Sequence, residues 1–548
     1  MRAFAAGTSE ENQEVRKPLP DRRQAMLLPP SVDEYIGPRH RVRVIVEVVG
    51  RLNLTGFNVG VSDEGRPAYP PEILVSLLFY AFSIGVFSAR EMERRCQTDC
   101  AFMFATAGFR PSHRSISRFR AAHEEDLSRL FAQILGVCRR AGLGNTARVA
   151  IDGTRQHANA SIDAHVRKEQ LEKELGKIRE DMKKMLNRAA KVDAEEDSNP
   201  DLANSDDVVP ERLEKKDRRA AAIEAAVKEL EESTSATGDA DTQTSGDEAH
   251  GVPTGPSDEG QQQSLEVKKE RAQEIEEKLK ELEQSGEIEA NETDPDARLQ
   301  RFKEGSRPGF NAQIAVSGED KLILAADVTQ DPGDQGQLIP MCDQVESNTG
   351  EKPGVITADS NYETGENYAE LAARGQDAVV ASACTKAAHK VRERTGLFQW
   401  VDFNYNAERD EYICPAGRPL IRVGSKPNDD KPKATYKAVD CADCPLKASC
   451  TKSEKRTLTV LETTPLLLNM SKRRQLDRQT DQFGAKRKVD VEPRFGHMKH
   501  NLRWKQFMRR GLAACRSEFR ILCAAMNLST LARWLGSREL AVSEIPVS

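Results

Sequence analysis

The sequence predicts an α/β protein with a helical region before its sheet, and three observations lead to this fold class. Residues 31–145 show apolar residues at the three- and four-residue spacing of helices. Short runs of β-forming residues, such as ARVAIDGTR at 147–155, return after residue 310 and alternate there with helical segments. Polar, acidic stretches interrupt the pattern between residues 164 and 305, so the 548 residues should form several units.

The charges of the chain are segregated along the sequence. Lys and Arg number 81 against 87 Asp and Glu, and the net charge of −6 alone would argue against a nucleic-acid partner. Much of the acidity, however, lies in the linkers 195–207 and 233–263, whereas residues 471–520 hold fifteen Lys and Arg against five acids. A nucleic-acid partner is therefore not excluded by the mean charge.

Four helical segments are predicted in the N-terminal region, at 32–52, 70–85, 88–108 and 112–142. The last two place arginines beside small hydroxyl residues, as where helix N-termini meet phosphates: Arg94, Arg95, Arg110, Arg114, Arg118 and Arg120. This pattern is typical of a helix-turn-helix type DNA-binding module, in which Arg114 and Arg118 would contact phosphates. A helical bundle with an ordinary basic solvent face is the alternative.

Neither a secretory signal nor a membrane span is expected. The stretch MRAFAAGTSEENQ lacks an apolar core, and the longest apolar run, 73–87, is shorter than the roughly 20 residues that a span requires. We expect a cytoplasmic protein without a membrane partner.

The region after the first strand predicts helices that cannot belong to the sheet. A heptad seam is formed by Leu171, Leu175, Ile178, Met182 and Met185. Weaker helical patterns follow at 213–230 and 265–282, and the acidic linkers 195–207 and 233–263 between the helices should be disordered. We predict a coiled-coil arm that provides dimer contacts, with an intramolecular helical hairpin as the alternative.

Two carboxylates follow apolar strands at like positions of the predicted sheet. Asp152 and Asp359 should emerge where their strands end, which is where ligands bind in open α/β sheets. Carboxylates in that arrangement suit Mg²⁺, which prefers oxygen ligands and binds substrate phosphate as well. For Asp152 the alternative is a purely structural role, in which Asp-Gly marks only a turn.

Glu492 is the candidate for a third acid. Asp490 is a plausible N-cap and Pro493 is tolerated in a first turn, so a helix should begin here. Glu492, Phe495 and Lys499 would then share one face, with Phe495 packed beneath the two charged groups.

For other polar residues near these acids, structural roles are favoured over functional ones. His157, His497 and His500 are more simply solvated or structural than catalytic. The turn-rich sequence ADVTQDPGDQG favours capping and turn roles for Asp327, Asp331 and Asp334, with a secondary-site role as the alternative.

The eleven cysteines suggest thiols, some on metal, rather than a disulfide framework. Four of them, Cys414, Cys441, Cys444 and Cys450, could hold a tetrahedral structural Zn²⁺; a reduced metal-free cluster and an iron–sulfur site are the alternatives. The others lie in apolar patterns and should be core residues: Cys96, Cys100, Cys138, Cys342, Cys384, Cys515 and Cys523.

The order of these motifs carries a resemblance. The segments IDGTRQHANAS, FNAQIAV, ADVTQDPGDQGQL, ITADSNYETGEN, DAVVAS and VEPRFGHMKHNLRWKQFMRRGL follow a basic helical region. Together they resemble the DDE transposases of bacterial insertion sequences, closest to the insertion sequence 1182 group, over roughly residues 30–535 without the acidic insert. The resemblance implies an RNase-H-like mixed sheet flanked by helices. It places Asp152 on the first strand, Asp359 after the fourth and Glu492 on a late helix as the DDE triad.

The resemblance also implies an activity. A DDE transposase binds the terminal repeats of its element and uses Mg²⁺ or Mn²⁺, normally two ions, for DNA cleavage and strand transfer. Its partners would be double-stranded DNA of the element ends and of the target, and a second subunit at least when ends are paired, with nucleoid association when DNA is bound. Backbone phosphates would be contacted by Lys499, Arg494, Arg487 and Lys486.

One signature of related transposases fits only in part. In the pattern Tyr-x2-Arg-x3-Glu-x6-Lys, Glu492 and Lys499 match, whereas the Tyr position falls on Ala485 and the Arg position on Lys488. Phe483 and Arg487 are nearby stand-ins.

The predicted domain organisation follows. We expect a flexible tail at 1–30, a helical DNA-binding domain at 31–145, and a catalytic core built from 146–163, 306–384 and 471–536. Residues 164–305 would form the coiled-coil and acidic insertion, 385–470 a Cys-rich insertion and 537–548 a C-terminal tail. An inactive DNA-binding protein or regulator of transposase descent, and a host nuclease on the same fold, are the alternative functions.

Overall fold

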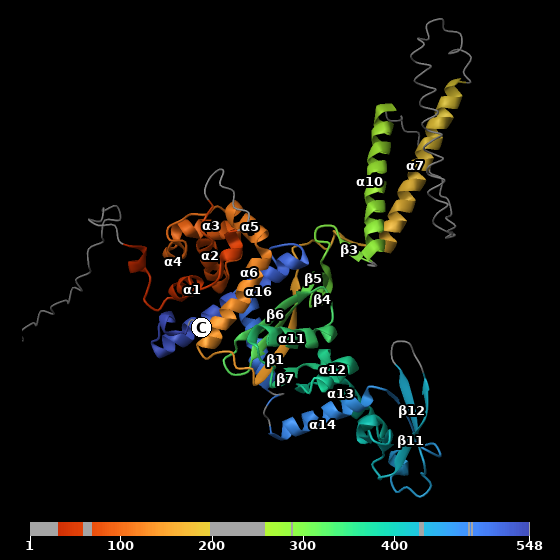
Figure 1. Ribbon diagram of the computed structural model, residues 1–548. Helices are drawn as coiled ribbons and strands as arrows, with labels where there is room; N and C mark the ends of the chain where they lie inside the picture. Colours follow the sequence, from red (N-terminus) through yellow and green to blue (C-terminus); the bar gives the residue numbers. More distant parts are fainter. Residues whose placement is uncertain are drawn as a thin grey trace, which may run out of the picture.

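The computed structural model describes residues 31–58, 68–197, 258–285, 289–426, 432–480, 483 and 486–546 (Figure 1). Its main sheet has the strand order β4-β5-β1-β7-β8, and β6 also pairs with β5. The strands are β1 (Arg148–His157), β4 (Arg298–Phe302), β5 (Gly305–Ser317), β6 (Ile323–Thr329), β7 (Val355–Ala358) and β8 (Asp377–Val380). The α/β class and the mixed sheet are confirmed, because β5 runs antiparallel to β1 whereas β7 runs parallel to it.

The apolar composition of the strands explains why they form the centre of the molecule. Val149, Ala150 and Ile151 of β1 are fully buried, and β5 is buried continuously from Pro308 to Ser317. A strand that is buried on both faces reads as a continuous apolar run, which is the pattern that predicted β1 and β5. Helix α11 (Leu338–Thr349) packs against β5 and β6.

The N-terminal region is helical, as predicted, with two breaks. Its helices are α1 (Arg41–Val49), α2 (Pro71–Ser83), α3 (Ala89–Thr98), α4 (Cys100–Ala105), α5 (His113–Ala122) and α6 (Glu124–Arg140). The segment predicted at 88–108 divides at Asp99, whose carboxylate accepts the N–H of Ala101 and caps α4. The segment predicted at 112–142 divides at His123.

Helix α16 (Leu512–Arg538) joins this helical region to the sheet. It packs against α6, α2 and α1 and also against β6, so one hydrophobic core runs through both parts. The predicted domain limit at 145/146 therefore lies within one continuous hydrophobic core. Within the range predicted as a tail, Val542 and Ile545 are buried in the same core. Within the range predicted as an insertion, β4 is part of the main sheet.

The predicted arm is a pair of helices within one chain. Helix α7 (Lys168–Asp197) and helix α10 (Asp258–Ser285) lie side by side above the short strands β2 (His165–Arg167) and β3 (Glu289–Asn291) (Figure 1). Their shared apolar cluster contains Leu171, Leu175, Ala272 and Ile275. The seam is thus used inside the chain, as in the hairpin alternative.

The linker predictions fail at their edges. Residues 195–197 belong to α7 and residues 258–263 to α10, so the disorder predicted there is wrong. The helix predicted at 213–230, the rest of the two linkers and the tail 1–30 lie outside the described residues.

The region predicted as a Cys-rich insertion, residues 385–470, contains a second sheet. Its five antiparallel strands have the order β13-β12-β11-β10-β9. They are β9 (Asn404–Asn406), β10 (Glu411–Ile413), β11 (Pro419–Lys426), β12 (Lys433–Ala438) and β13 (Thr457–Leu461). Along the chain, helix α12 (Gly365–Ala373) lies between β7 and β8, and α13 (Ala383–Thr395) connects the main sheet to the second sheet. Helix α14 (Thr464–Thr480) follows the second sheet, and α15 (Lys486–Gly496) comes next. Among the described helices, none has the length and apolar content needed to cross a membrane.

Asn527 of α16 provides a test of how the helix is held on the sheet. Its buried amide accepts the N–H of Ile323 at 2.9 Å and donates to the carbonyl of Ile323 at 2.8 Å. Because Asn527→Leu leaves both backbone groups buried and unpaired, we expect it to lower the free energy of unfolding by about 2–4 kcal/mol in urea denaturation. Ser529→Ala is the control, because the Ser529 hydroxyl bonds only within its own helix. Equal effects of the two substitutions would contradict this role.

Candidate active site

Asp152 and Asp359 lie level with each other on neighbouring parallel strands. Ala150 of β1 is in register with Thr357 of β7. Asp152 comes two residues after Ala150, and Asp359 comes two residues after Thr357. Strand β7 ends at Ala358, and the Asp359 carboxylate accepts the N–H of Asn361 at 2.8 Å where the chain turns. The prediction that Asp152 lies at the end of its own strand is wrong, because β1 continues to His157. The neighbouring strand β7 is the one that ends beside Asp152.

The Asp152 carboxylate is withdrawn from water and close to a second acid. Burial raises the pKa of Asp152 to about 6, Arg487 opposes the rise and the charge of Asp359 adds to it. An ion pair of 2.8 Å joins the Asp152 carboxylate to Arg487 of α15. Two neighbouring carboxylates, one of them desolvated, are a donor set that fits a divalent cation.

Gly153 lies in the middle of β1, so the interpretation of Asp-Gly as a turn is wrong. A Cβ atom at Gly153 would lie 2.6 Å from Oδ1 of Asp334. Only glycine therefore permits this close approach. The buried Asp334 carboxylate accepts 2.7 Å hydrogen bonds from the side-chain amides of Asn311 and Gln313, and a longer one from Asn361.

Asp334 is an acid for which the main prediction is a turn role and a secondary-site role is the alternative. Its carboxylate sits beneath β1, and its charge contributes with that of Asp152 to a raised pKa of Tyr362, which burial raises most. The Tyr362 hydroxyl donates to Gln313, which completes a polar network under the two acids. Asp331 and Asp327 do not share this position: the first accepts a bond from Gln337 and the second pairs with Arg516.

Helix α15 begins earlier than predicted. It starts at Lys486, so Pro493 lies inside the helix and Asp490 is not its N-cap. The Asp490 carboxylate is buried, pairs with Arg148 at 3.0 Å and also contacts Lys321. These two ion pairs fasten α15 to the start of β1 and to the turn before β6.

Glu492 is exposed on α15 and is not gathered with the two aspartates. Across the described ranges, no three His, Cys, Asp or Glu side chains are arranged to hold a metal ion. Lys499 does reach the site region, because its ammonium donates to the Thr154 hydroxyl at 2.5 Å and to the carbonyl of Arg155. Thr154 lies two residues after Asp152 and faces the same side of the sheet. Phe495 is buried, as expected.

The other predicted phosphate contacts have different environments. Arg487 is engaged by Asp152. Arg494 is withdrawn from solvent, which lowers its pKa to about 10, and its nearest partners are Thr530 and the carbonyl of Asp320 at 3.4 Å. Lys486, Arg114 and Arg118 are exposed.

Three of the six N-terminal arginines are engaged inside the protein. Arg94 and Arg95 pair with Glu91, and Arg120 is buried against Glu518 of α16 at 3.0 Å. Arg110, Arg114 and Arg118 are exposed, and Arg114 and Arg118 remain the predicted phosphate contacts of this region.

The histidines are structural or exposed, as predicted. His157 stacks on Phe302 with 3.8 Å between ring centroids. Burial lowers the pKa of both His157 and His497. His500 is exposed.

The four predicted zinc ligands line one small cavity beside β11 and β12. Cys414 begins a tight turn in which Gly417 has φ +78°, and the N–H of Arg418 donates to Cys414 Sγ at 3.3 Å. Burial raises the pKa of the Cys450 thiol, Arg456 opposes the rise, and the charges of the other three cysteines add to it. The thiols share the cavity without forming a closed ligand shell in the described residues.

Two family models match the chain. The Transposase DDE domain matches residues 413–532 and the Transposase domain (DUF772) matches residues 30–122. Together they cover less than half of the chain; Glu492 and the four cysteines lie inside the first match, and Asp152 and Asp359 lie outside both. No curated protein and no solved structure matches. The two matches support a family of DDE transposases.

The raised pKa of Asp152 gives a prediction for stability without metal. The fold favours the protonated acid, so the stabilising contribution is present below its ordinary pKa of 3.8 and is lost as the pH rises through about 6. Asn resembles the protonated acid. We therefore expect Asp152→Asn in EDTA to be more stable than the wild type near pH 8, by up to about 3 kcal/mol, and equal to it near pH 4.

Thermal unfolding across this pH range measures the difference. Asp331→Asn serves as the control, because it removes an exposed carboxylate and surface substitutions have small effects. A stability difference between Asp152→Asn and the wild type that does not change with pH would refute the assignment.

Proposed function

We propose that the protein is a transposase that binds the terminal repeats of an insertion sequence and cleaves and joins DNA at Asp152 and Asp359. The observation that carries this proposal is that Asp152 on β1 and Asp359, directly after β7, lie at the same level of the sheet, with Asp152 desolvated. The two transposase-domain matches support the same class of protein.

The topology of the main sheet supports the RNase-H-like core that the resemblance implies. Strands β1, β5 and β6 form an antiparallel meander, and β7 and β8 run parallel to β1 on its other side. Apart from the small additions β2 to β4, Asp152 then lies on the first strand and Asp359 follows the fourth. Assignment to the insertion sequence 1182 group rests on the sequence motifs.

The chemistry requires a divalent cation, which Asp152 and Asp359 would hold. Bound Mg²⁺ or Mn²⁺ supplies activation of a water or a DNA 3′-hydroxyl and stabilisation of the leaving oxygen. In the protein as described, Arg487 neutralises Asp152. If a cation shared that carboxylate, Arg487 would be able to pair with a DNA phosphate. Lys499, held against Thr154, would position another phosphate.

Glu492 is proposed as the third acid of the triad. It follows Arg487 by five residues on the same helix, about 7.5 Å along the axis, so α15 already contacts the site one and a half turns away. Its exposed position means that the triad is completed only by a shift of α15 or of its side chain. The polar network under Asp152 and Asp359, built on Asp334, keeps the other two acids in place.

The second candidate function is a catalytically inactive DNA-binding protein of transposase descent. Two observations favour it: Glu492 is apart from the aspartates, and Arg487 occupies the Asp152 carboxylate. A nuclease on the same fold would cut DNA and not join it, so a strand-transfer assay distinguishes it from a transposase.

We also propose that the protein pairs DNA ends as a homo-oligomer, because synapsis needs more than one subunit. The apolar seam of α7 and α10 is used within the chain. Contacts between subunits on the arm would therefore involve its charged outer surface.

Cleavage of DNA from the flanks of the gene, in Mg²⁺ or Mn²⁺, tests the proposed function. The wild type should nick the DNA at a defined end and join it to a target. Asp152→Asn, Asp359→Asn and Glu492→Gln should lose cleavage and retain DNA binding, because each removes a proposed metal ligand. Asp331→Asn should keep full activity. Binding without cleavage by the wild type, unchanged by these substitutions, would establish the inactive alternative.

The Cys414 cluster is proposed as a structural zinc site, because four thiols leave no open position for catalysis. Purified protein should contain one zinc ion per chain by elemental analysis, and Cys444→Ser should lose the zinc and lower the melting temperature. Cys384→Ser is the control, because Cys384 does not line the cavity. This cysteine is exposed, so the prediction that it is a core residue is wrong. Protein free of zinc and iron, with a fully stable Cys444→Ser variant, would refute the site.

A further inference from the structure

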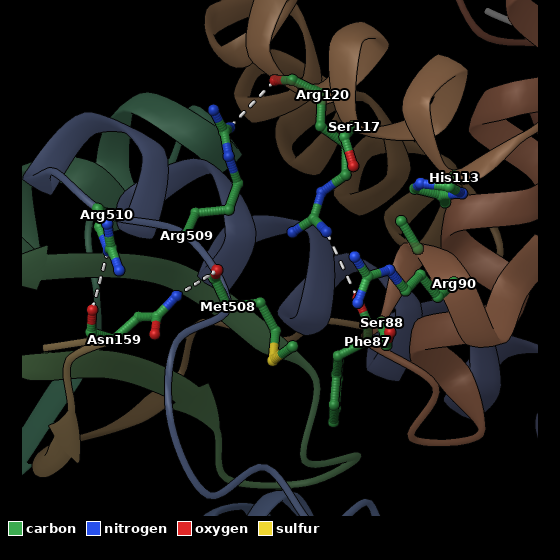
Figure 2. Close-up of a pocket in the computed structure, with 11 residues that line it drawn as sticks. Phe87, Ser88, Arg90, His113, Ser117, Arg120, Asn159, Met508, Arg509 and Arg510 are labelled. Carbon is green, nitrogen blue, oxygen red and sulfur yellow. Dashed lines mark hydrogen bonds between the residues drawn. The ribbon is translucent and has the colours of Figure 1, made fainter.

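A second basic site lies between the N-terminal helices and the segment before α16. It is an open cavity of about 530 Å³ (Figure 2). One wall comes from the start of α3 and from α5, including Arg90, Ser117 and Arg120. The opposite wall comes from Asn159, which follows β1, and from Met508–Arg510. Neither Asp152 nor Asp359 lines it, so this cavity is separate from the proposed catalytic acids.

The cavity is lined by cations without acids. Four arginines face it, Arg90, Arg120, Arg509 and Arg510, and no aspartate or glutamate is among its lining residues. Arg509 is balanced from behind by Glu124 and Arg120 by Glu518. Arg90 and Arg510 are exposed at the rim, and within the described part of the chain neither forms an ion pair. Arg510 uses only its Nε, which donates to the carbonyl of Asn159 at 3.0 Å.

The deep wall contains a donor that lacks a partner. Arg120 is 5% exposed, and among the described residues its Nε has no hydrogen-bond partner. Its guanidinium lies between the walls, where one terminal nitrogen makes a long bond of 3.4 Å to the carbonyl of Phe87 (Figure 2). A buried donor left unpaired is costly, and an anionic oxygen that enters the cavity would relieve that cost.

Helix α3 adds its N-terminus to the same wall. Ser88 is its N-cap residue and makes no side-chain capping bond, so the side chain does not occupy the first-turn amides. Ser88, Ala89 and Arg90 all line the cavity. The positive end of the helix dipole therefore points to the place where the arginines gather.

We infer that this cavity binds the phosphodiester backbone of double-stranded DNA, an inference that rests on the proposed function. The cations stand on two walls of an open cavity, an arrangement that fits successive phosphates better than one small anion. The two walls belong to the proposed recognition helices and to the segment that leads into α16. DNA bound here would therefore be fixed to both parts of the protein. Such contacts give affinity and register but no sequence reading.

Binding of a fluorescein-labelled duplex of arbitrary sequence tests the inference. Arg90→Ala and Arg510→Ala should each weaken binding roughly tenfold and lower the slope of log affinity against log salt by about one. Both side chains are exposed, so the fold should be retained, which circular dichroism checks. Arg129→Ala is the matched control: it removes an exposed arginine that is paired with Glu125 on α6 and does not line the cavity.

The outcomes separate this inference from the proposed function. If the wild type binds the duplex and cleaves its own flanking DNA while Arg90→Ala and Arg510→Ala bind like Arg129→Ala, the cavity inference is overturned and the proposed function stands. If the wild type binds no DNA, both are overturned. A final arm compares sodium phosphate with sodium chloride at equal ionic strength. Stronger competition by phosphate in the wild type than in Arg90→Ala would support a phosphate site that the DNA backbone occupies, whereas equal competition in the two proteins, with equal affinity for DNA, would overturn the inference.

Discussion

The packing of α16 is the constraint on which the rest of the structure depends. Its buried residues fill the core between the N-terminal helices and β6, so that neither part has a complete apolar interior without it. Two polar contacts fix its position: Asn527 bonds the backbone of Ile323 in β6, and Glu518 pairs with the buried Arg120 of α5. Both would be costly to leave unpaired, which gives the helix one register against its neighbours. The helices proposed to recognise DNA and the strands that carry the two aspartates are thereby held in a fixed relation.

Buried acids with defined donors recur wherever an element must be placed accurately. Asp490 fastens α15 to Arg148, and Asp334 joins the loop after β6 to Asn311 and Gln313 of β5. Asp152 differs, because its burial raises its pKa and a single arginine opposes the rise. An acid that its surroundings stabilise poorly in the charged form gains more from a cation than a well-solvated acid does. Among the described residues, Asp490 has two cationic partners, Arg148 and Lys321, whereas Asp152 has one, which is a reason to propose the chemistry at Asp152.

The sequence predicted the parts of the fold that depend on local pattern and missed those that depend on distant partners. The apolar run before Asp152 and the one before Asp359 identified β1 and β7, and register between them then brought the acids together. The second sheet was missed because β9 and β10 have three residues each, too few to show a period of two. The sequence predicts an N-cap role for Asp490 because its true partners, Arg148 and Lys321, are more than 160 residues away in the chain. A turn role is the main prediction for Asp334 for the same reason, since a turn-rich sequence does not reveal which strand the turn will cover.

The distribution of arginine partners shows why charge counts along a sequence do not locate a nucleic-acid surface. Basic residues of the N-terminal helices and of the C-terminal block often form ion pairs with acids of the same chain: Arg95 with Glu91, Arg473 with Asp377 and Arg516 with Asp327. An arginine with a close carboxylate partner must give that partner up before it binds a phosphate, and part of the gain is lost in the exchange. Exposed arginines without such a partner in the described residues, such as Arg90 and Arg510, lose nothing of this kind. Affinity for DNA should therefore follow the unpaired cations, and a chain with a net charge of −6 can bind a polyanion through the few places where its folding leaves them.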